Sequence, residues 1–172
     1  MRKTCKIREE ESRDMEAVLV LNQLAFGRDN ESRLVERLRK TEAFVPELSL
    51  VAVRQQEIVG YILFTRIKIQ GETSHESLAL APMAVHPEHQ RAGIGRELIR
   101  AGLARAEDLG FDSVIVLGHP GYYPRFGFQR ASRWGIRCPF DVPDEAFLAL
   151  GLREGALRGK DGTVQYADPF YE

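Results

Sequence analysis

Cysteines and long apolar runs are scarce in this chain. Its 172 residues include only Cys5 and Cys138, too few for a disulfide framework in a chain long enough to bury a core, so both are expected as reduced thiols. No uncharged apolar stretch approaches the roughly 20 residues that a membrane-spanning helix needs. Residues 1–14 are charged throughout and lack the apolar segment of a signal peptide. We therefore expect a cytoplasmic protein that has no membrane partner.

An excess of charge of either sign is also missing. The chain carries 24 Lys and Arg against 25 Asp and Glu, a formal net charge of -1. Such a chain has no global field that attracts nucleic acid, so nucleic acid is not an expected partner and any polyanion must be held by a local site. There is no internal repeat and no Gly/Ser/Pro linker. The sequence therefore predicts a single domain over residues 1–172.

The first part of the chain has helical spacing of its apolar residues. The expected helices begin at caps, Ser12 or Asp14 for the first and Asn30 for the second. Gly27 is expected to end the first helix, and Pro46 closes this part of the chain.

Residues 48–53 and 58–69 are rich in β-branched and aromatic residues, and the short polar stretch between them predicts an antiparallel hairpin. A short edge strand is expected at residues 6–8. Residues 77–85 form an almost charge-free run that predicts a buried strand. Because Pro82 lies inside this run and has no N–H, one side of the strand should lose its pairing there.

Residues 93–109 follow the i, i+3, i+4, i+7 pattern of an amphipathic helix, and Gly110 is its expected stop. Residues 112–117 predict a buried strand after it, which makes a βαβ unit with a parallel strand pair. The fold class is therefore α+β, with a mostly antiparallel sheet and one parallel pair. In the last part we expect short helices at 122–126 and 144–150, and strands at 129–131 and 163–166.

The loop between the buried strand and the longest helix carries the clearest chemical signal. It consists of Gln90, Arg91, Ala92, Gly93, Ile94 and Gly95 and is followed by Arg96. A helix N-terminus offers unpaired amides, glycines let the backbone curl around an anion, and guanidinium groups suit phosphate oxygens. The loop predicts a pyrophosphate site, although a simple strand-to-helix turn is the alternative. Leu98 replaces the third glycine of a Rossmann fingerprint, and Arg96-Glu97 replaces the Lys-Ser/Thr of a P-loop.

These residues resemble the Gcn5-related N-acetyltransferase (GNAT) family, whose motif Q/R-x-x-G-x-G/A follows a strand ending in a Val-x-Pro turn. Here Met83-Ala84-Val85-His86-Pro87 precedes Gln90–Gly95. A second motif of the family, Tyr-x-x-x-Gly-Phe, is matched by residues 123–128. The stretches 117–120, 134–137 and 155–157 look like the YhbS-like subgroup. The resemblance covers nearly the whole chain and implies a single-domain fold whose parallel strand pair is splayed at the cofactor cleft.

The resemblance implies which residues serve the donor substrate, acetyl-CoA. The backbone of Met83, Ala84 and Val85 would bind the pantetheine arm and polarise the thioester carbonyl. The loop from Gln90 to Arg96 would hold the pyrophosphate. Tyr123 would be the general acid for the leaving thiolate, and Phe126 would touch the cofactor.

No general base is assigned. Some family members carry a glutamate where this chain has Ala79, while Glu76, His86 and His119 are weak alternatives beside a water relay or an amine that arrives deprotonated. His86 and His89 lack further metal ligands, so no metal is expected. The family walls its acceptor pocket with segments that correspond to residues 26–29 and 134–145, and the acidic residues of the second suit a cationic amine.

The sequence thus predicts an acetyl-CoA-dependent N-acetyltransferase that acts by direct attack of a primary amine, carried by a small molecule or a protein. The alternative is a non-catalytic module on the same fold that senses acyl-CoA or serves as an interaction subunit. An acyl-CoA other than acetyl-CoA is a third possibility. Many relatives pair as homodimers, but no heptad or obvious apolar patch of this chain requires a dimer.

Overall fold

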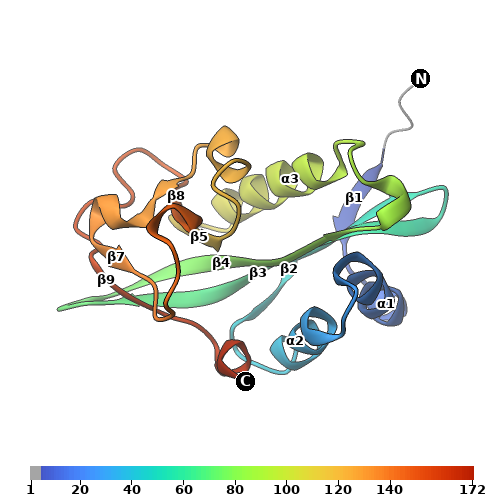
Figure 1. Cartoon of the computed structure of the whole chain (residues 1–172), viewed down its shortest axis with the longest axis horizontal. Coiled ribbons are helices and arrows are strands. Elements are labelled where there is room, and N and C mark those ends of the chain that lie inside the picture. The colour runs from blue at the N-terminus through green and yellow to red at the C-terminus, as the bar shows by residue number, and fades with distance from the viewer. Residues whose placement is uncertain (1–4) are drawn as a thin grey trace. The chain divides into compact units, whose positions relative to one another are not determined.

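A computed structural model describes residues 5–172 of the chain (Figure 1). Three helices and a mixed set of strands follow one another along the sequence. Their bounds are β1 Lys6–Glu9, α1 Met15–Phe26, α2 Asn30–Leu38, β2 Phe44–Arg54, β3 Glu57–Gln70, β4 Ser74–Val85, α3 Ile94–Asp108, β5 Ser113–Leu117, β6 Gln129–Arg130, β7 Ile136–Arg137, β8 Phe147–Gly151 and β9 Gly162–Gln165.

The internal contacts divide the structure into two compact units. The first unit holds Met1–Phe64 and Ala81–Arg105, and the second holds Thr65–Leu80 and Ala106–Glu172. Strands β3 and β4 contribute residues to both. The prediction of one domain over residues 1–172 stays a prediction, and residues 1–4 lie outside the described part. Within that part, no helix is long and apolar enough to cross a membrane.

The first unit is a sheet with the strand order β1-β2-β3-β4. Figure 1 shows α1 and α2 on one side of these strands and α3 on the other. Because both faces are covered, residues 48–52 of β2 are buried without alternation. Gly60 lets α3 approach β3 closely, since a Cβ there would lie 2.8 Å from Ile94 Cγ2. The predicted hairpin is confirmed, and its turn consists of two residues with positive φ, Gln55 and Gln56.

A buried polar network fastens the ends of β1 and α2 to this sheet. Glu10, just after β1, pairs with Arg39, just after α2, and their side chains are only 2% and 10% exposed. Ser49 of β2 donates to Glu10 Oε1 at 3.1 Å, and its hydroxyl lies 2.7 Å from that of Tyr61 of β3. Burial raises the pKa of the Glu10 carboxyl even though Arg39 opposes the shift. The ionised Glu10 therefore depends on its partners.

Replacing Arg39 should leave this buried carboxylate without its cation. We expect Arg39→Met to lower the free energy of unfolding by about 3 kcal/mol, measured by urea denaturation at pH 7. Adding Glu10→Leu should restore a large part of the loss, because two apolar side chains need no charge compensation. An Arg39→Met variant as stable as the parent would contradict this account of the network.

The second unit has the strand order β3-β4-β5-β8-β6, and β9 pairs with both β3 and β7. The parallel pair of β4 and β5 is confirmed, and its register covers only Leu78 with Val114 and Ala79 with Ile115. Strand β5 continues beyond these residues and pairs antiparallel with β8 as far as Leu117. The shared register of β4 and β5 thus ends before Pro82, as the missing N–H of proline predicted.

Two serines close the other end of this parallel pair. Both Ser77 and Ser113 are fully buried, and their hydroxyls lie 2.7 Å apart. Ser77 also donates to the carbonyl oxygen of Ser113 at 3.1 Å. Buried hydroxyls are costly without partners, so this reciprocal arrangement stabilises the start of β5 against β4.

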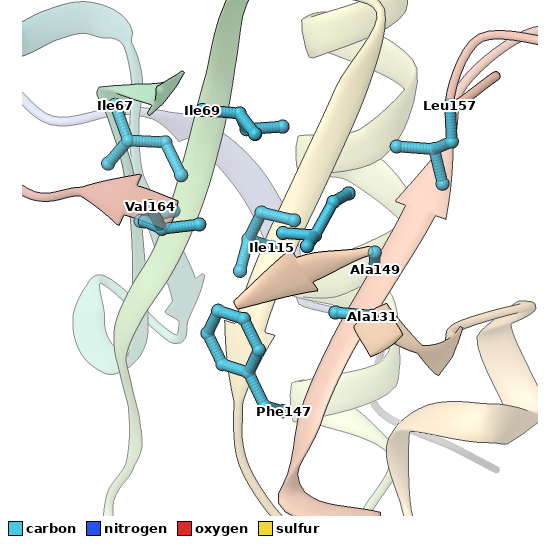
Figure 2. Close-up of a cluster of buried hydrophobic side chains, with 10 residues drawn as sticks. Ile67, Ile69, Ile115, Ala131, Phe147, Ala149, Leu157 and Val164 are labelled. Carbon is cyan, nitrogen blue, oxygen red and sulfur yellow. The ribbon is translucent and has the colours of Figure 1, made fainter. Parts of the chain in front are cut away.

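The core of the second unit forms where β3, β5, β8 and β9 present apolar side chains to one cluster. Figure 2 shows the labelled members pointing toward one another from these strands and from neighbouring segments. The buried members are Ile67, Ile69, Ala79, Ile115, Ala131, Ile136, Phe147, Ala149, Leu157 and Val164.

The expected helix at 144–150 is wrong. Only residues 144–146 form a helical turn, and Phe147–Gly151 is strand β8. β8 pairs with β5 on one side and β6 on the other, and Phe147, Leu148 and Ala149 are all buried. A short run that is buried on every side has neither the helical nor the strand period, so only pairing decides its structure. The expected strand at 129–131 ends at Arg130, and β7 was not predicted.

The helix starts also differ from expectation. Asp14 occupies the N-cap position of α1, but its carboxylate makes no cap bond to α1; it accepts from the Glu11 amide at 2.8 Å, in a capping box of the preceding turn, and from Arg8 at 2.6 Å. Asp29 precedes α2, so Asn30 is its first residue and not its cap. Pro46 lies inside β2. The stop residues Gly27 and Gly110 are confirmed, with φ of 67° and 90°.

A surface ion-pair group joins the start of β5 to the late loops of the second unit. Asp112 accepts from Arg153 Nε at 2.8 Å and from Lys160 Nζ at 3.2 Å. These hydrogen bonds, that of Arg153 first, lower the pKa of Asp112 to about 2. A carboxyl whose pKa is lowered by folding adds stability above its unfolded pKa and loses it as the pH falls through the folded value.

We therefore expect Asp112→Asn to lower the free energy of unfolding at pH 7 by about 1 kcal/mol, after allowance for solvent screening of a partly exposed group. The difference between variant and parent should shrink between about pH 4 and pH 2. Urea denaturation across this range measures it. A difference that stays constant down to pH 2 would show that the ion pair is not its cause.

Candidate functional site

The predicted phosphate loop belongs to the first unit, where it leads from the end of β4 into α3. Backbone hydrogen bonds hold the segment that leads into the loop. The His86 amide donates to Val59 O of β3 and the His89 amide to His86 O, both at 2.8 Å. Gln90 Nε2 donates back to Val85 O at 3.3 Å. The loop therefore starts from a fixed position on the sheet.

The loop backbone then turns so that amides gather at the start of α3. Arg91 and Gly93 both have positive φ, 65° and 82°. The Glu97 amide makes the first helical hydrogen bond, to Gly93 O at 3.1 Å. The amides of residues 94–96 have no carbonyl one turn before them in the helix, so they can donate to an anion. A Cβ built on Gly93 meets no heavy atom within 4 Å, which leaves this side of the loop open.

Three arginines lie in or near this stretch of the chain. Arg91 and Arg96 of the predicted set are both exposed. The sequence did not indicate Arg54, at the end of β2, whose Nη1 lies 3.4 Å from Nδ1 of His89. No motif marks Arg54, because only the β2–β3 hairpin brings it to the loop. The donor set of helix amides and guanidinium groups fits a diphosphate.

Met83, Ala84 and Val85 are the last residues of β4. Ala84 is buried, while Met83 and Val85 are half-buried. The residues of β4 that pair with β5 in the described chain are Leu78 and Ala79 alone. The paired register of β4 with β5 therefore ends before residues 83–85.

Tyr123 belongs to the second unit, in a single helical turn at residues 123–126. Its side chain is buried, with edge-on contacts to the rings of Tyr122 at 5.2 Å and Phe128 at 5.7 Å. Burial, with a smaller contribution from Tyr122, raises the pKa of Tyr123 to about 12. The phenol is therefore protonated at neutral pH and able to donate.

Phe126, the predicted cofactor contact, is half-buried, and its ring lies 5.4 Å from that of Tyr122. It shares the second unit with Tyr123, whereas the phosphate loop and the end of β4 belong to the first. The structure thus groups the predicted site residues into two sets, each with its own geometry.

Ala79, at the position where some family members carry a glutamate, is part of the apolar core. Ala79 is buried among the apolar cluster of the second unit, so it supplies no base. Glu76 and His119 are exposed, and Nδ1 of His86 accepts from the Glu88 amide at 3.1 Å. None of these is assigned as a base. In the predicted acceptor wall, Trp134 packs against the core, and Asp144 pairs with Arg130 at 3.4 Å.

Comparison with known proteins finds relatives in sequence and in fold. The model of the acetyltransferase (GNAT) family matches residues 9–128. The uncharacterized N-acetyltransferase YhbS of Escherichia coli K12 is 33% identical over 158 residues, which cover 91% of this chain and 93% of that protein. The uncharacterized N-acetyltransferase YjhQ of the same strain is 43% identical over 123 residues, 70% of this chain and 68% of YjhQ.

Solved structures agree with the sequence relatives. The crystal structure of E. coli YhbS in complex with CoA matches with a TM-score of 0.92 and 30% identity, covering 98% of this chain and 93% of that one. A GNAT family acetyltransferase from Brucella melitensis in complex with acetyl-CoA matches with a TM-score of 0.80 and 29% identity, covering 98% and 99%. The family match, the relatives and the shared fold lead to one conclusion: the chain belongs to the acetyltransferase (GNAT) family.

Proposed function

We propose that this protein is an acetyl-CoA-dependent N-acetyltransferase that acetylates a primary amine by direct attack. The observation that carries the proposal is the amide cradle at the start of α3, open at Gly93 and flanked by arginines. Two similar proteins support it, because their crystal structures are described as complexes with CoA and with acetyl-CoA.

The donor-binding residues divide the long cofactor between them. Residues 90–96 hold the diphosphate through helix amides and the guanidinium groups of Arg91 and Arg96. The backbone of Met83, Ala84 and Val85 binds the pantetheine arm and polarises the thioester carbonyl. The family resemblance assigns Phe126 a contact with the cofactor.

Acetyl-CoA supplies an acyl group on a good leaving group, a thiolate. The lone pair of the amine nitrogen forms a bond to the carbonyl carbon, and the carbon–sulfur bond breaks. Tyr123, as the general acid, donates a hydrogen bond to the departing sulfur, and the nitrogen releases a proton to water. A free thiol has a pKa near roughly 8.5, well below that of the phenol, so the hydrogen bond stabilises the developing thiolate and the released CoA thiolate takes its proton from solvent.

One observation favours a second function, the binding of acyl-CoA without catalysis. Ala79 lies in the core where some relatives carry a glutamate, which leaves room for a module that binds acyl-CoA without turnover. Thiol release from acetyl-CoA with a panel of small amines and amine-bearing peptides separates the two. Release that requires an amine supports the enzyme. We also propose that the acceptor is an amine of a small molecule or of a protein. A homodimer is a further proposal.

Ligands that occupy the amide cradle should stabilise the protein. Acetyl-CoA and CoA at about 100 times their Kd should stabilise the protein by about 2.7 kcal/mol and raise its Tm, whereas ATP and NAD should not. Gly93→Ala should weaken this rise, because the new methyl group fills the open side of the cradle. Differential scanning fluorimetry with each ligand measures both effects.

Gly110→Ala is the matched control, because Gly110 has a φ of 90° at the other end of α3 and also meets no heavy atom within 4 Å. Both variants carry the same kind of backbone strain, so both should lose stability without ligand. Only Gly93→Ala should lose the response to CoA. If no ligand raises the Tm of the parent protein, residues 90–95 form an empty turn and the proposed function fails.

Removal of the Tyr123 hydroxyl tests its role as the general acid. Tyr123→Phe should lower kcat at least tenfold, about 1.4 kcal/mol of transition-state stabilisation, with the Kd for CoA unchanged. Tyr122→Phe keeps an aromatic ring beside Tyr123 and should change kcat less than about twofold. Steady-state thiol release and calorimetry with CoA give the two quantities. An unchanged kcat in Tyr123→Phe would remove the acid role.

A further inference from the structure

Gly118 directly follows β5, and the ring of Tyr123 packs against it. A Cβ added at Gly118 would lie 2.4 Å from Cε2, 2.9 Å from Cδ2 and 3.3 Å from Cζ of Tyr123. Cζ is the atom that bears the hydroxyl. The φ of Gly118 is outside the left-handed region, so its backbone does not itself require glycine. The reason for glycine at this position is the space that the ring occupies.

The backbone at Gly118 has little freedom to move away from an added side chain. Its amide donates to Ala146 O at 2.9 Å, and the residue before it, Leu117, is paired with Phe147 of β8. Gly118 thus continues the pairing of β5 with β8. A shift of its backbone would break these contacts.

The ring of Tyr123 is confined from its other sides. The rings of Tyr122 and Phe128 lie edge-on to it, with centroids 5.2 Å and 5.7 Å from its own, and Phe128 is almost fully buried. The Tyr123 amide donates to His119 O at 3.3 Å. An added methyl group at residue 118 would therefore displace the ring, and the hydroxyl with it, because the β5–β8 pairing holds the backbone on the other side of the clash.

We propose that Gly118 is a positioning residue for the reaction. The absence of its side chain sets the place of the Tyr123 hydroxyl, and Tyr122 and Phe128 hold the ring against it. This inference rests on the proposed function, in which that hydroxyl donates to the leaving sulfur. Hydrogen-bond donation depends steeply on distance and angle, so a displaced hydroxyl loses most of its effect.

The test compares Gly118→Ala with Gly121→Ala. Gly121 is in the same turn, is likewise outside the left-handed region, and meets no heavy atom within 4 Å, so its variant adds the same methyl group without a clash. We expect Gly118→Ala to lower kcat about tenfold with the KM for acetyl-CoA unchanged, and Gly121→Ala to stay within about twofold of the parent.

A double variant separates positioning from a general loss of structure. If Gly118 acts through the Tyr123 hydroxyl, Gly118→Ala combined with Tyr123→Phe should be no slower than Tyr123→Phe alone, within about twofold. Titration of phenolate absorbance gives a readout without turnover. The displaced ring of Gly118→Ala should ionise at lower pH than in the parent, and Tyr123→Phe should abolish that difference.

These measurements separate the acid role of Tyr123 from the positioning role of Gly118. If Tyr123→Phe lowers kcat while Gly118→Ala behaves like Gly121→Ala, the positioning role is wrong and the acid role stands. Additive losses in the double variant also overturn the positioning role. If Tyr123→Phe leaves kcat unchanged, the acid role fails and this inference fails with it. If Gly118→Ala does not fold, Phe128→Leu loosens the same ring and should give the same non-additive loss with Tyr123→Phe.

Discussion

The structure of the candidate site depends on where strand β4 stops pairing with β5. β4 shares only two residue pairs with β5, and Pro82, a few residues farther along β4, cannot donate a ladder hydrogen bond. Two buried serines hold the start of this parallel pair together, so the pair is fixed at one end. The residues of β4 beyond Pro82 therefore lead to the phosphate loop without a β5 partner. In the proposed function, their backbone groups bind the donor.

Buried polar groups support the fold of each unit. Glu10 pairs with Arg39 in the first unit, and Ser77 with Ser113 in the second. Partners are not universal, because the buried hydroxyl of Thr65 has none among the described residues. Tyr123 is held in a different way, since its ring is buried against the rings of Tyr122 and Phe128. Packing therefore sets the place of this candidate acid.

The apolar position at Ala79 bears on how the amine reaches the reaction. A carboxylate placed there would be buried among Ile67, Ile115 and their neighbours, where an unpaired charge is costly. The core of the second unit is thus built for a small apolar residue at this position. The proposed reaction accordingly releases the amine proton to water, and a neutral amine is the reactive form.

The sequence by itself determined the parts of this protein that depend on local patterns. The helical period of residues 93–109, the glycine stop at Gly110 and the phosphate loop before α3 follow from spacing and backbone freedom, so the structure places these elements as predicted. The family resemblance likewise needed only the motifs at residues 83–95 and 123–128. Their roles in the reaction stay predictions, because the sequence states which residues occur and not what they contact.

Only the tertiary structure decided the features that depend on distant neighbours. Residues 147–151 became a strand because β5 and β6 pair with them on both sides, and a short apolar run has no period that reveals such pairing. Asp14 turned toward Arg8 and the Glu11 amide and left α1 uncapped. A hairpin placed Arg54 beside His89, just before the phosphate loop, and a turn placed Tyr123 against Gly118. In each case the physical reason is packing between residues that the fold brings together.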